Sequence, residues 1–109
     1  MTETTRTARI VLTTAGTQEE AERMGRALVE ERLAACATVI PGAQSIYLWE
    51  GKVESAAETL LLIKTEADRL EQLERRLNAL HGYTTPEFLV LAVDAGSRAY
   101  LDWLSGCLR

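Results

Sequence analysis

The sequence predicts an α+β fold, a ferredoxin-like βαββαβ sandwich followed by a short C-terminal helix. Strand-like runs and amphipathic helical patterns follow one another in the order β-α-β-β-α-β. The length of 109 residues suits one domain, and no linker, low-complexity tract or sequence repeat divides it. We therefore expect a single domain over residues 1–109, with the polar residues 1–7 as a flexible tail.

The first strand and the first helix are predicted within residues 8–35. The run 8–16 is rich in β-branched residues and closes on Ala-Gly, which is typical of a strand. Thr17 followed by Glu20 fits a capping box, so a helix should begin there. Apolar side chains then recur at helical spacing on one face.

Two long strands joined by a tight turn are predicted next. Residues 36–49 are rich in β-branched and aromatic side chains, and Pro41-Gly42 within them indicates a bulge. The sequence Glu-Gly-Lys at 50–52 provides the glycine of a hairpin whose second strand covers 53–65. With about a dozen residues each, these strands would extend beyond the helices as an arm.

The remaining elements are a second helix, a last strand and a short final helix. The second helix should open behind Thr65, present a stripe of leucines and end at Gly82. The strand 86–93 starts at a proline, residues 94–96 form a turn, and Ser97 caps the final helix.

The last strand also indicates assembly. In a βαββαβ sheet it lies at an edge, next to the first strand. Residues 88–93 are nevertheless apolar on both faces and include no lysine. Together with the long arm, this edge favours strand pairing between subunits. The alternative is that the terminal helix folds back over the edge.

The composition excludes some classes of partner. The net charge is −4 with no basic block, which argues against nucleic acid or an anionic membrane as a partner. No stretch approaches the ~20 apolar residues of a membrane span, and the polar start does not look like a signal peptide. We therefore expect a cytoplasmic protein whose two cysteines, Cys36 and Cys107, stay reduced.

Few residues offer chemistry. Three roles are open for Cys36, which are a small buried hydrophobe, a soft ligand for Cu(I), or a nucleophile. Glu58 and Lys64 share one strand face but lie ~20 Å apart, so each needs solvent or a partner from elsewhere, another subunit included. His81 lies in the last turn of the second helix, where it ends the helix or binds a metal weakly. No phosphate-binding loop or catalytic motif is present.

Four segments are distinctive when they are read together. They are "LAACATVIPGAQSIYLWEGKVE", "ETLLLIKT", "HGYTTPEFLVLAV", and a glycine followed by "YLDWL". In this order they resemble the CutA divalent-cation tolerance family. The resemblance implies a compact homotrimer of ferredoxin-like subunits joined by strand pairing, similar in architecture to the PII signalling proteins. It also implies a role in tolerance to copper and other divalent cations, with no firm enzymatic activity.

The resemblance further implies a set of site residues. The family usually has a proline after the histidine of the third segment, where this chain has Gly82. The histidine motif itself falls on His81, Tyr83, Pro86 and Glu87. The residues of the family's intersubunit cleft, with this tyrosine, fall on Cys36, Trp49, Glu58, Lys64, Tyr83, Tyr100 and Trp103.

Three functions remain as alternatives. We predict non-enzymatic binding of a divalent metal such as copper or zinc, with no obligatory cofactor, by His81 with Glu87 or water, or by Cys36. The second function is a PII-like module that binds a small anionic metabolite in the intersubunit clefts, where Lys64 supplies positive charge and Glu58 accepts a hydrogen bond. The third is an enzyme with Cys36 as its nucleophile, for which the sequence names no substrate.

Overall fold

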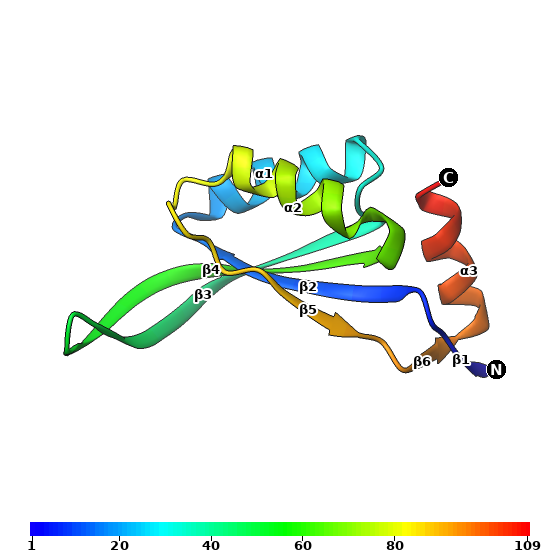
Figure 1. Ribbon diagram of the computed structural model, residues 1–109, viewed down its shortest axis with the longest axis horizontal. Helices are drawn as coiled ribbons and strands as arrows, with labels where there is room; N and C mark the ends of the chain where they lie inside the picture. Colours follow the sequence, from blue (N-terminus) through cyan, green and yellow to red (C-terminus); the bar gives the residue numbers. More distant parts are fainter.

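The protein folds as two helices on one face of a four-stranded antiparallel sheet, as predicted, in a computed structural model that describes all 109 residues (Figure 1). The strand order is β3-β4-β2-β5, so the last strand of this sheet lies at an edge beside the first. The strands of this sheet are β2 Ala8–Ala15, β3 Cys36–Trp49, β4 Lys52–Glu66 and β5 Leu89–Ala92. The helices are α1 Gln18–Glu30, α2 Leu70–Leu80 and α3 Arg98–Cys107.

Helix α1 begins as the sequence predicts. The Thr17 hydroxyl accepts a hydrogen bond from the backbone N–H of Glu20 at 3.1 Å. The helix ends at Glu30, several residues before the expected 35. Arg32 takes a left-handed backbone with φ 58°, and the next two N–H groups both donate to the carbonyl of Leu28, which closes the helix.

The predicted bulge and hairpin are confirmed. The register of β3 against β4 shifts between Ile40 and Ala43, where Pro41-Gly42 lies. Glu50 and Gly51 both have positive φ, 50° and 80°, as a two-residue hairpin turn requires. The outer parts of β3 and β4 project beyond the helices as an arm (Figure 1).

The second helix starts and ends differently from the prediction. Strand β4 runs through Thr65, whose hydroxyl donates to the carbonyl of Leu33 at 2.7 Å and therefore does not cap a helix. A single 3₁₀ turn, η1 Ala67–Arg69, precedes α2. The predicted cap at Gly82 and the helical position of His81 are both wrong, because His81 is the C-cap and is extended, with ψ 141°.

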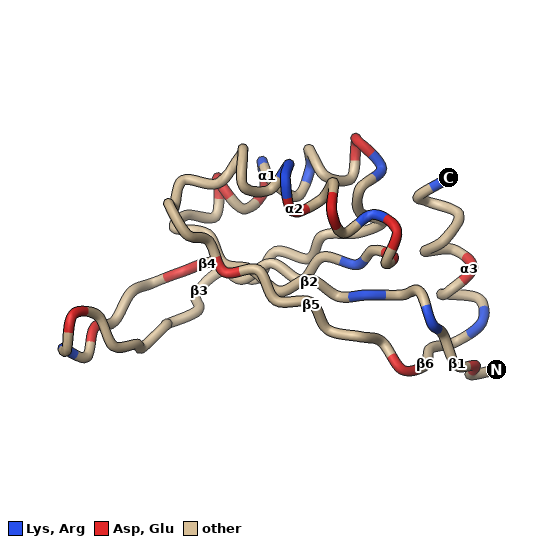
Figure 2. Tube along the Cα trace, viewed as in Figure 1, with Lys and Arg blue, Asp and Glu red and all other residues tan.

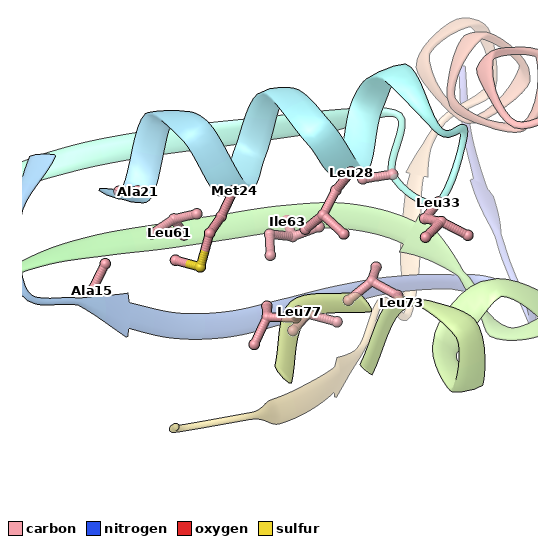
Figure 3. Close-up of a cluster of buried hydrophobic side chains, with 11 residues drawn as sticks. Ala15, Ala21, Met24, Leu28, Leu33, Leu61, Ile63, Leu73 and Leu77 are labelled. Carbon is pink, nitrogen blue, oxygen red and sulfur yellow. The ribbon is translucent and has the colours of Figure 1, made fainter. Parts of the chain in front are cut away.

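The core lies between the helices and the sheet (Figure 3). Fully buried side chains come from both helices and from the two central strands. Each buried Leu, Ile or Met contributes about 1.5–3 kcal/mol to stability. The largest are Val11, Met24, Leu28, Leu61, Ile63, Leu73 and Leu77.

The opposite face of the sheet has no helix over it. Directly paired residues share a face, so this open face carries Ile10, Leu12, Leu60, Leu62, Leu89 and Leu91. Figure 2 shows no charged residue along β5. Helix α3 buries Leu104 and Leu108 with Ala35 and leaves β5 exposed. The terminal helix therefore does not fold back over the edge strand, which was the alternative to pairing between subunits.

The chain termini are tied down, in contrast to the expected flexible tail. Thr2–Thr4 form β1, which pairs with β6, Ala95–Ser97, where a turn was predicted. The predicted cap of α3 is confirmed, because the Ser97 hydroxyl accepts from the N–H of Tyr100 at 3.2 Å. None of the helices has the length and apolar character that a membrane span requires.

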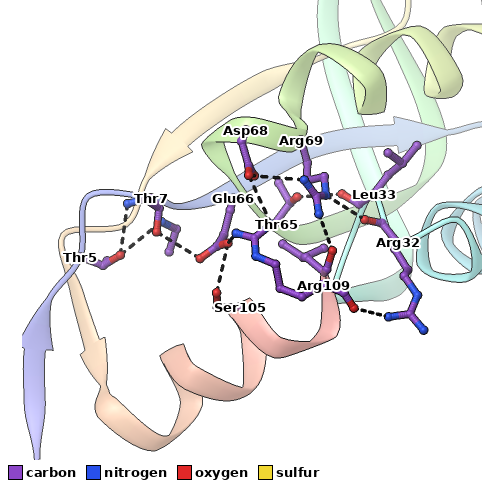
Figure 4. A network of polar contacts seen from close by, with 12 residues as sticks. Thr5, Thr7, Arg32, Leu33, Thr65, Glu66, Asp68, Arg69, Ser105 and Arg109 are labelled. Carbon is purple, nitrogen blue, oxygen red and sulfur yellow. Dashed lines mark hydrogen bonds and ion pairs between the residues drawn. The ribbon is translucent and has the colours of Figure 1, made fainter.

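A polar network holds α3 against the end of β4 (Figure 4). The buried carboxylate of Glu66 accepts hydrogen bonds from Thr7 and Ser105 and forms a 2.6 Å ion pair with Arg109. Arg69 donates to the carbonyl of Leu108. These contacts place the aromatic side chains of α3 near the inner end of β4.

Candidate functional site

A groove of about 970 Å³ lies between the base of the arm and the loop that joins α2 to β5. One wall is the arm face that continues the open face of the sheet, and the other is the loop. The lining includes three carboxylates and three aromatic rings and contains no lysine or arginine. The lining residues are Thr14, Ser45, Ile46, Tyr47, Trp49, Glu54, Ala56, Glu58, Gly82, Tyr83, Thr84, Thr85 and Glu87.

Glu58 is the most constrained carboxylate of the groove. Its Oε2 accepts a hydrogen bond from the Tyr83 hydroxyl at 2.9 Å. Desolvation alone would raise the pKa of Glu58, but hydrogen bonds from Ser45, Tyr83 and Thr14 favour the ionised form more strongly and hold the pKa below its usual value. Glu58 is therefore a negative charge that its own subunit fixes in place.

Tyr83 is correspondingly a hydrogen-bond donor that stays protonated. Desolvation, followed by the hydrogen bond to the Glu58 carboxylate, raises the pKa of Tyr83 to about 12. Its ring lies 4.7 Å from that of His81, centroid to centroid. A Cβ added at Gly16 would lie 3.4 Å from the Tyr83 hydroxyl, an ordinary van der Waals contact, so the ring packs against the end of β2.

His81 has both ring nitrogens in hydrogen bonds to the backbone. Nδ1 accepts from the N–H of Tyr83 at 3.0 Å, and Nε2 lies 2.6 Å from the carbonyl oxygen of Thr14. This network assigns the proton to Nε2, which donates to the carbonyl. Neither nitrogen has a free lone pair for a metal, so the geometry favours a structural role for His81 over the predicted metal-binding one.

The three predicted metal ligands do not converge within one subunit. Cys36 lies at the inner end of β3, His81 is buried under the loop, and Glu87 lines the groove. No group of three or more His, Cys, Asp or Glu side chains is placed to hold a metal ion. Metal binding by these residues stays a prediction.

A second cluster, which we call the lysine cluster, lies at the inner end of β4. It comprises Cys36, Lys64, Tyr100 and Trp103. The Lys64 ammonium is 3.8 Å from the Cys36 sulfur and 5.9 Å from the centre of the Tyr100 ring, which stacks at 5.3 Å on that of Trp103. None of the ion pairs in the structure includes Lys64.

The predicted cleft residues thus divide into two groups on one face of β4. Trp49, Glu58 and Tyr83 belong to the groove, and the other four form the lysine cluster. Sequence reasoning missed Glu54, although strand alternation places it with Tyr47 on the face of Glu58. It also missed Ser45, which the same alternation places beside Tyr47, and Thr14, whose position opposite Leu60 depends on the pairing of β2 with β4.

Comparison with known proteins identifies the family. The CutA1 divalent ion tolerance protein family matches residues 9–107. The chain belongs to this family. It is 48% identical over 95 residues to the divalent-cation tolerance protein CutA of Thermus thermophilus, covering 87% of this chain and 92% of the relative. It is 42% identical to the chloroplastic protein CutA of Arabidopsis thaliana, covering 92% of this chain and 55% of that one.

The fold comparison agrees with the sequence comparison. The structure of CutA from Synechococcus elongatus complexed with a Bis-Tris molecule superposes with a TM-score of 0.92 at 38% identity, covering 99% of this chain and 100% of that one. The resemblance to CutA inferred from the four segments is therefore confirmed, and so is the fold it implies.

Proposed function

We propose that this CutA chain acts in tolerance to divalent cations and does so by binding them, without catalysing a reaction. Its membership of the family and the name of its Thermus relative support the role. The observation that supports cation binding is the groove, where Glu54, Glu58 and Glu87 are accompanied by no lysine or arginine. Such a concave surface of one charge sign concentrates cations.

The proposed binding is weak and depends on carboxylates. His81 has no lone pair to offer, and the Lys64 ammonium 3.8 Å from Cys36 opposes a cation at that thiol. Separate carboxylates with water as the remaining ligands give loose sites with fast exchange. Glu58 is the anchor, because its ionised form is already held in position.

Calorimetric titration with Cu(II) and Zn(II) tests this proposal. Glu58→Gln should weaken binding clearly, whereas Glu71→Gln, an exposed residue of α2 outside the groove, should leave it unchanged. Cells that lack their own copy should then lose copper resistance with the Glu58 variant and keep it with the control. Equal affinity of wild type and Glu58→Gln would remove the groove from the function.

We further propose a homotrimer joined through the open face and the β5 edge. Leu89 and Leu91 of the open face are 57% and 48% exposed. Unprotected apolar edges of this kind pair with other chains, and an obligate interface would exceed ~2,000 Å² in total. Light scattering at micromolar concentration should give a trimer mass for wild type and a lower mass for Leu91→Lys. A monomeric wild type would contradict this assembly.

A second candidate is a signalling module that binds a small molecule. The Synechococcus relative complexed with Bis-Tris favours it. In one subunit the groove offers no positive charge, so an anionic metabolite would need Lys64 from another subunit. Citrate is a suitable probe. Binding that Lys64→Ala abolishes would support this function over cation binding.

The cytoplasmic location stays a prediction. Relatives of this family include a chloroplastic protein, so membership alone does not place the chain in one compartment. Fractionation of the source cells measures it directly.

A further inference from the structure

The loop that follows α2 is held in place by its own first residues. It starts at His81, whose Nε2 donates to the Thr14 carbonyl, and it delivers the Tyr83 hydroxyl to Glu58. Gly82 lies between these two anchors. Whatever fixes the position of Gly82 therefore also fixes the wall of the groove.

Glu20 is the residue that contacts Gly82. Its Oε2 accepts the Gly82 N–H at 2.9 Å, and its Oε1 accepts the Gly16 N–H at 3.2 Å. In a capping box this glutamate would turn back to the N–H of Thr17. Here Oε1 accepts instead from the N–H of Gly16, one residue before Thr17, and Oε2 accepts from Gly82, which lies 62 residues away in the sequence.

The fit between Glu20 and Gly82 is close on both sides. A Cβ added at Gly82 would lie 2.6 Å from Glu20 Oε2, a separation that real Cβ atoms essentially never show. Because this oxygen is the far end of a flexible side chain, a side chain at 82 would displace the Glu20 carboxylate from the N–H groups that it accepts. A proline at 82 would in addition remove the N–H that the carboxylate accepts. The glycine at 82 thus provides both the space and the N–H that the Glu20 carboxylate uses.

We propose that Glu20 and Gly82 form a latch that holds the loop so that Tyr83 reaches Glu58. Glu20 is thus a positioning residue that acts through Tyr83 and does not itself line the groove. The functional meaning of the latch rests on the proposed function, in which the groove binds cations through Glu58. Opening the latch frees Tyr83 and removes one of the hydrogen bonds that hold the Glu58 carboxylate.

The first test is amide hydrogen exchange of the loop, followed by NMR at neutral pH. With the latch intact, the N–H of Gly82 donates to Glu20 and the N–H of Tyr83 donates to His81 Nδ1. In Glu20→Ala the Tyr83 N–H should lose protection together with the Gly82 N–H, because the loop that carries both groups is no longer held. Glu19→Ala, an exposed acid in the same helical turn, is the matched control and should leave the protection of both groups unchanged.

The second test is a double-mutant cycle of stability at positions 20 and 82. Gly82→Ala should destabilise the wild type more than it destabilises Glu20→Ala, because in the wild type the new Cβ pushes the carboxylate away from the Gly82 and Gly16 N–H groups, whereas in Glu20→Ala the atom that it would meet is gone. Additive effects at positions 20 and 82, or unchanged protection of the Tyr83 N–H in folded Glu20→Ala, would overturn the latch.

Cation titration of the same variants separates the latch from the proposed function. If the Tyr83 N–H loses protection in Glu20→Ala while Cu(II) affinity stays that of Glu19→Ala, the latch stands and the groove is not the cation site. If the affinity falls together with the protection, both are supported.

Discussion

Glu58 and Lys64 lie on the same face of β4, with Leu60 and Leu62 between them, yet their surroundings differ in kind. The Glu58 carboxylate is hydrogen-bonded by neutral donors of its own subunit, Tyr83 among them. Lys64 touches only a thiol, at 3.8 Å, and the face of a tyrosine ring. The Glu58 carboxylate is thus held in place by its own subunit, whereas the Lys64 ammonium is free to bind a partner from outside the subunit.

The physical reason lies in the loop after α2. A charge withdrawn from water must be hydrogen-bonded or paired, and only the groove end of β4 has a loop that brings donors to it. At the other end α3 offers aromatic faces, which attract a cation more weakly and without a fixed direction. The comparison therefore predicts that variants at the groove end affect folding within the subunit, and that variants at the lysine cluster affect assembly.

The largest effect is expected at His81, which ties the loop to β2. His81→Ala should lower the free energy of unfolding by about 2–4 kcal/mol, because the Thr14 carbonyl and the Tyr83 N–H lose their partners and a cavity forms. Chemical denaturation at fixed protein concentration measures it. Asn78→Ala on the exposed side of α2 is the control. A loss no larger than that of the control would mean that His81 does not hold the groove.

A smaller effect is expected from Glu58→Gln, about 1 kcal/mol near neutral pH, since a charge-assisted hydrogen bond becomes a neutral one. Its signature is the pH dependence. The folded pKa of Glu58 is lowered, so its contribution is present above the unfolded pKa and is lost as the pH falls through the folded pKa. Wild type and variant should therefore converge in stability on acidification. A stability difference that persists in acid would contradict this account.

The hydrogen-bonded pair of Tyr83 and Glu58 also predicts a loss of stability at alkaline pH. The folded pKa of Tyr83 is raised to about 12, above the unfolded value near 10. Its stabilising contribution is present below the unfolded pKa and is lost as the pH rises through the folded one. Tyr83→Phe, which has no phenol to ionise, should lack this alkaline loss in a denaturation series measured against pH.

The smallest effect on the isolated subunit is expected at Lys64. Lys64→Ala should change the free energy of unfolding by no more than about 0.5 kcal/mol in a monomeric background such as Leu91→Lys. In the assembled protein it should weaken self-association, as measured by light scattering on dilution. A large loss in the monomer would show that Lys64 is fixed within its own subunit, and the contrast with Glu58 would then fail.

The sequence by itself determined the features that depend on near neighbours. The order of strands and helices follows from hydrophobic periodicity, the start of α1 from Thr17, and the bulge from Pro41-Gly42. The shared face of Glu58 and Lys64 follows from the two-residue period of a strand. Each of these is settled within a few residues, so the local pattern is enough.

Only the tertiary structure decided which distant groups meet. The Nε2 of His81 faces a carbonyl 67 residues away, and the Glu20 carboxylate, expected to accept from the N–H of Thr17, accepts instead from Gly16 and Gly82. The start of the chain, expected to be loose, pairs with Ala95–Ser97. These contacts depend on how the loop and the strand ends are placed by the folded sheet. A hydrogen-bonding group takes whatever partner that placement brings near, and the sequence pattern does not encode it.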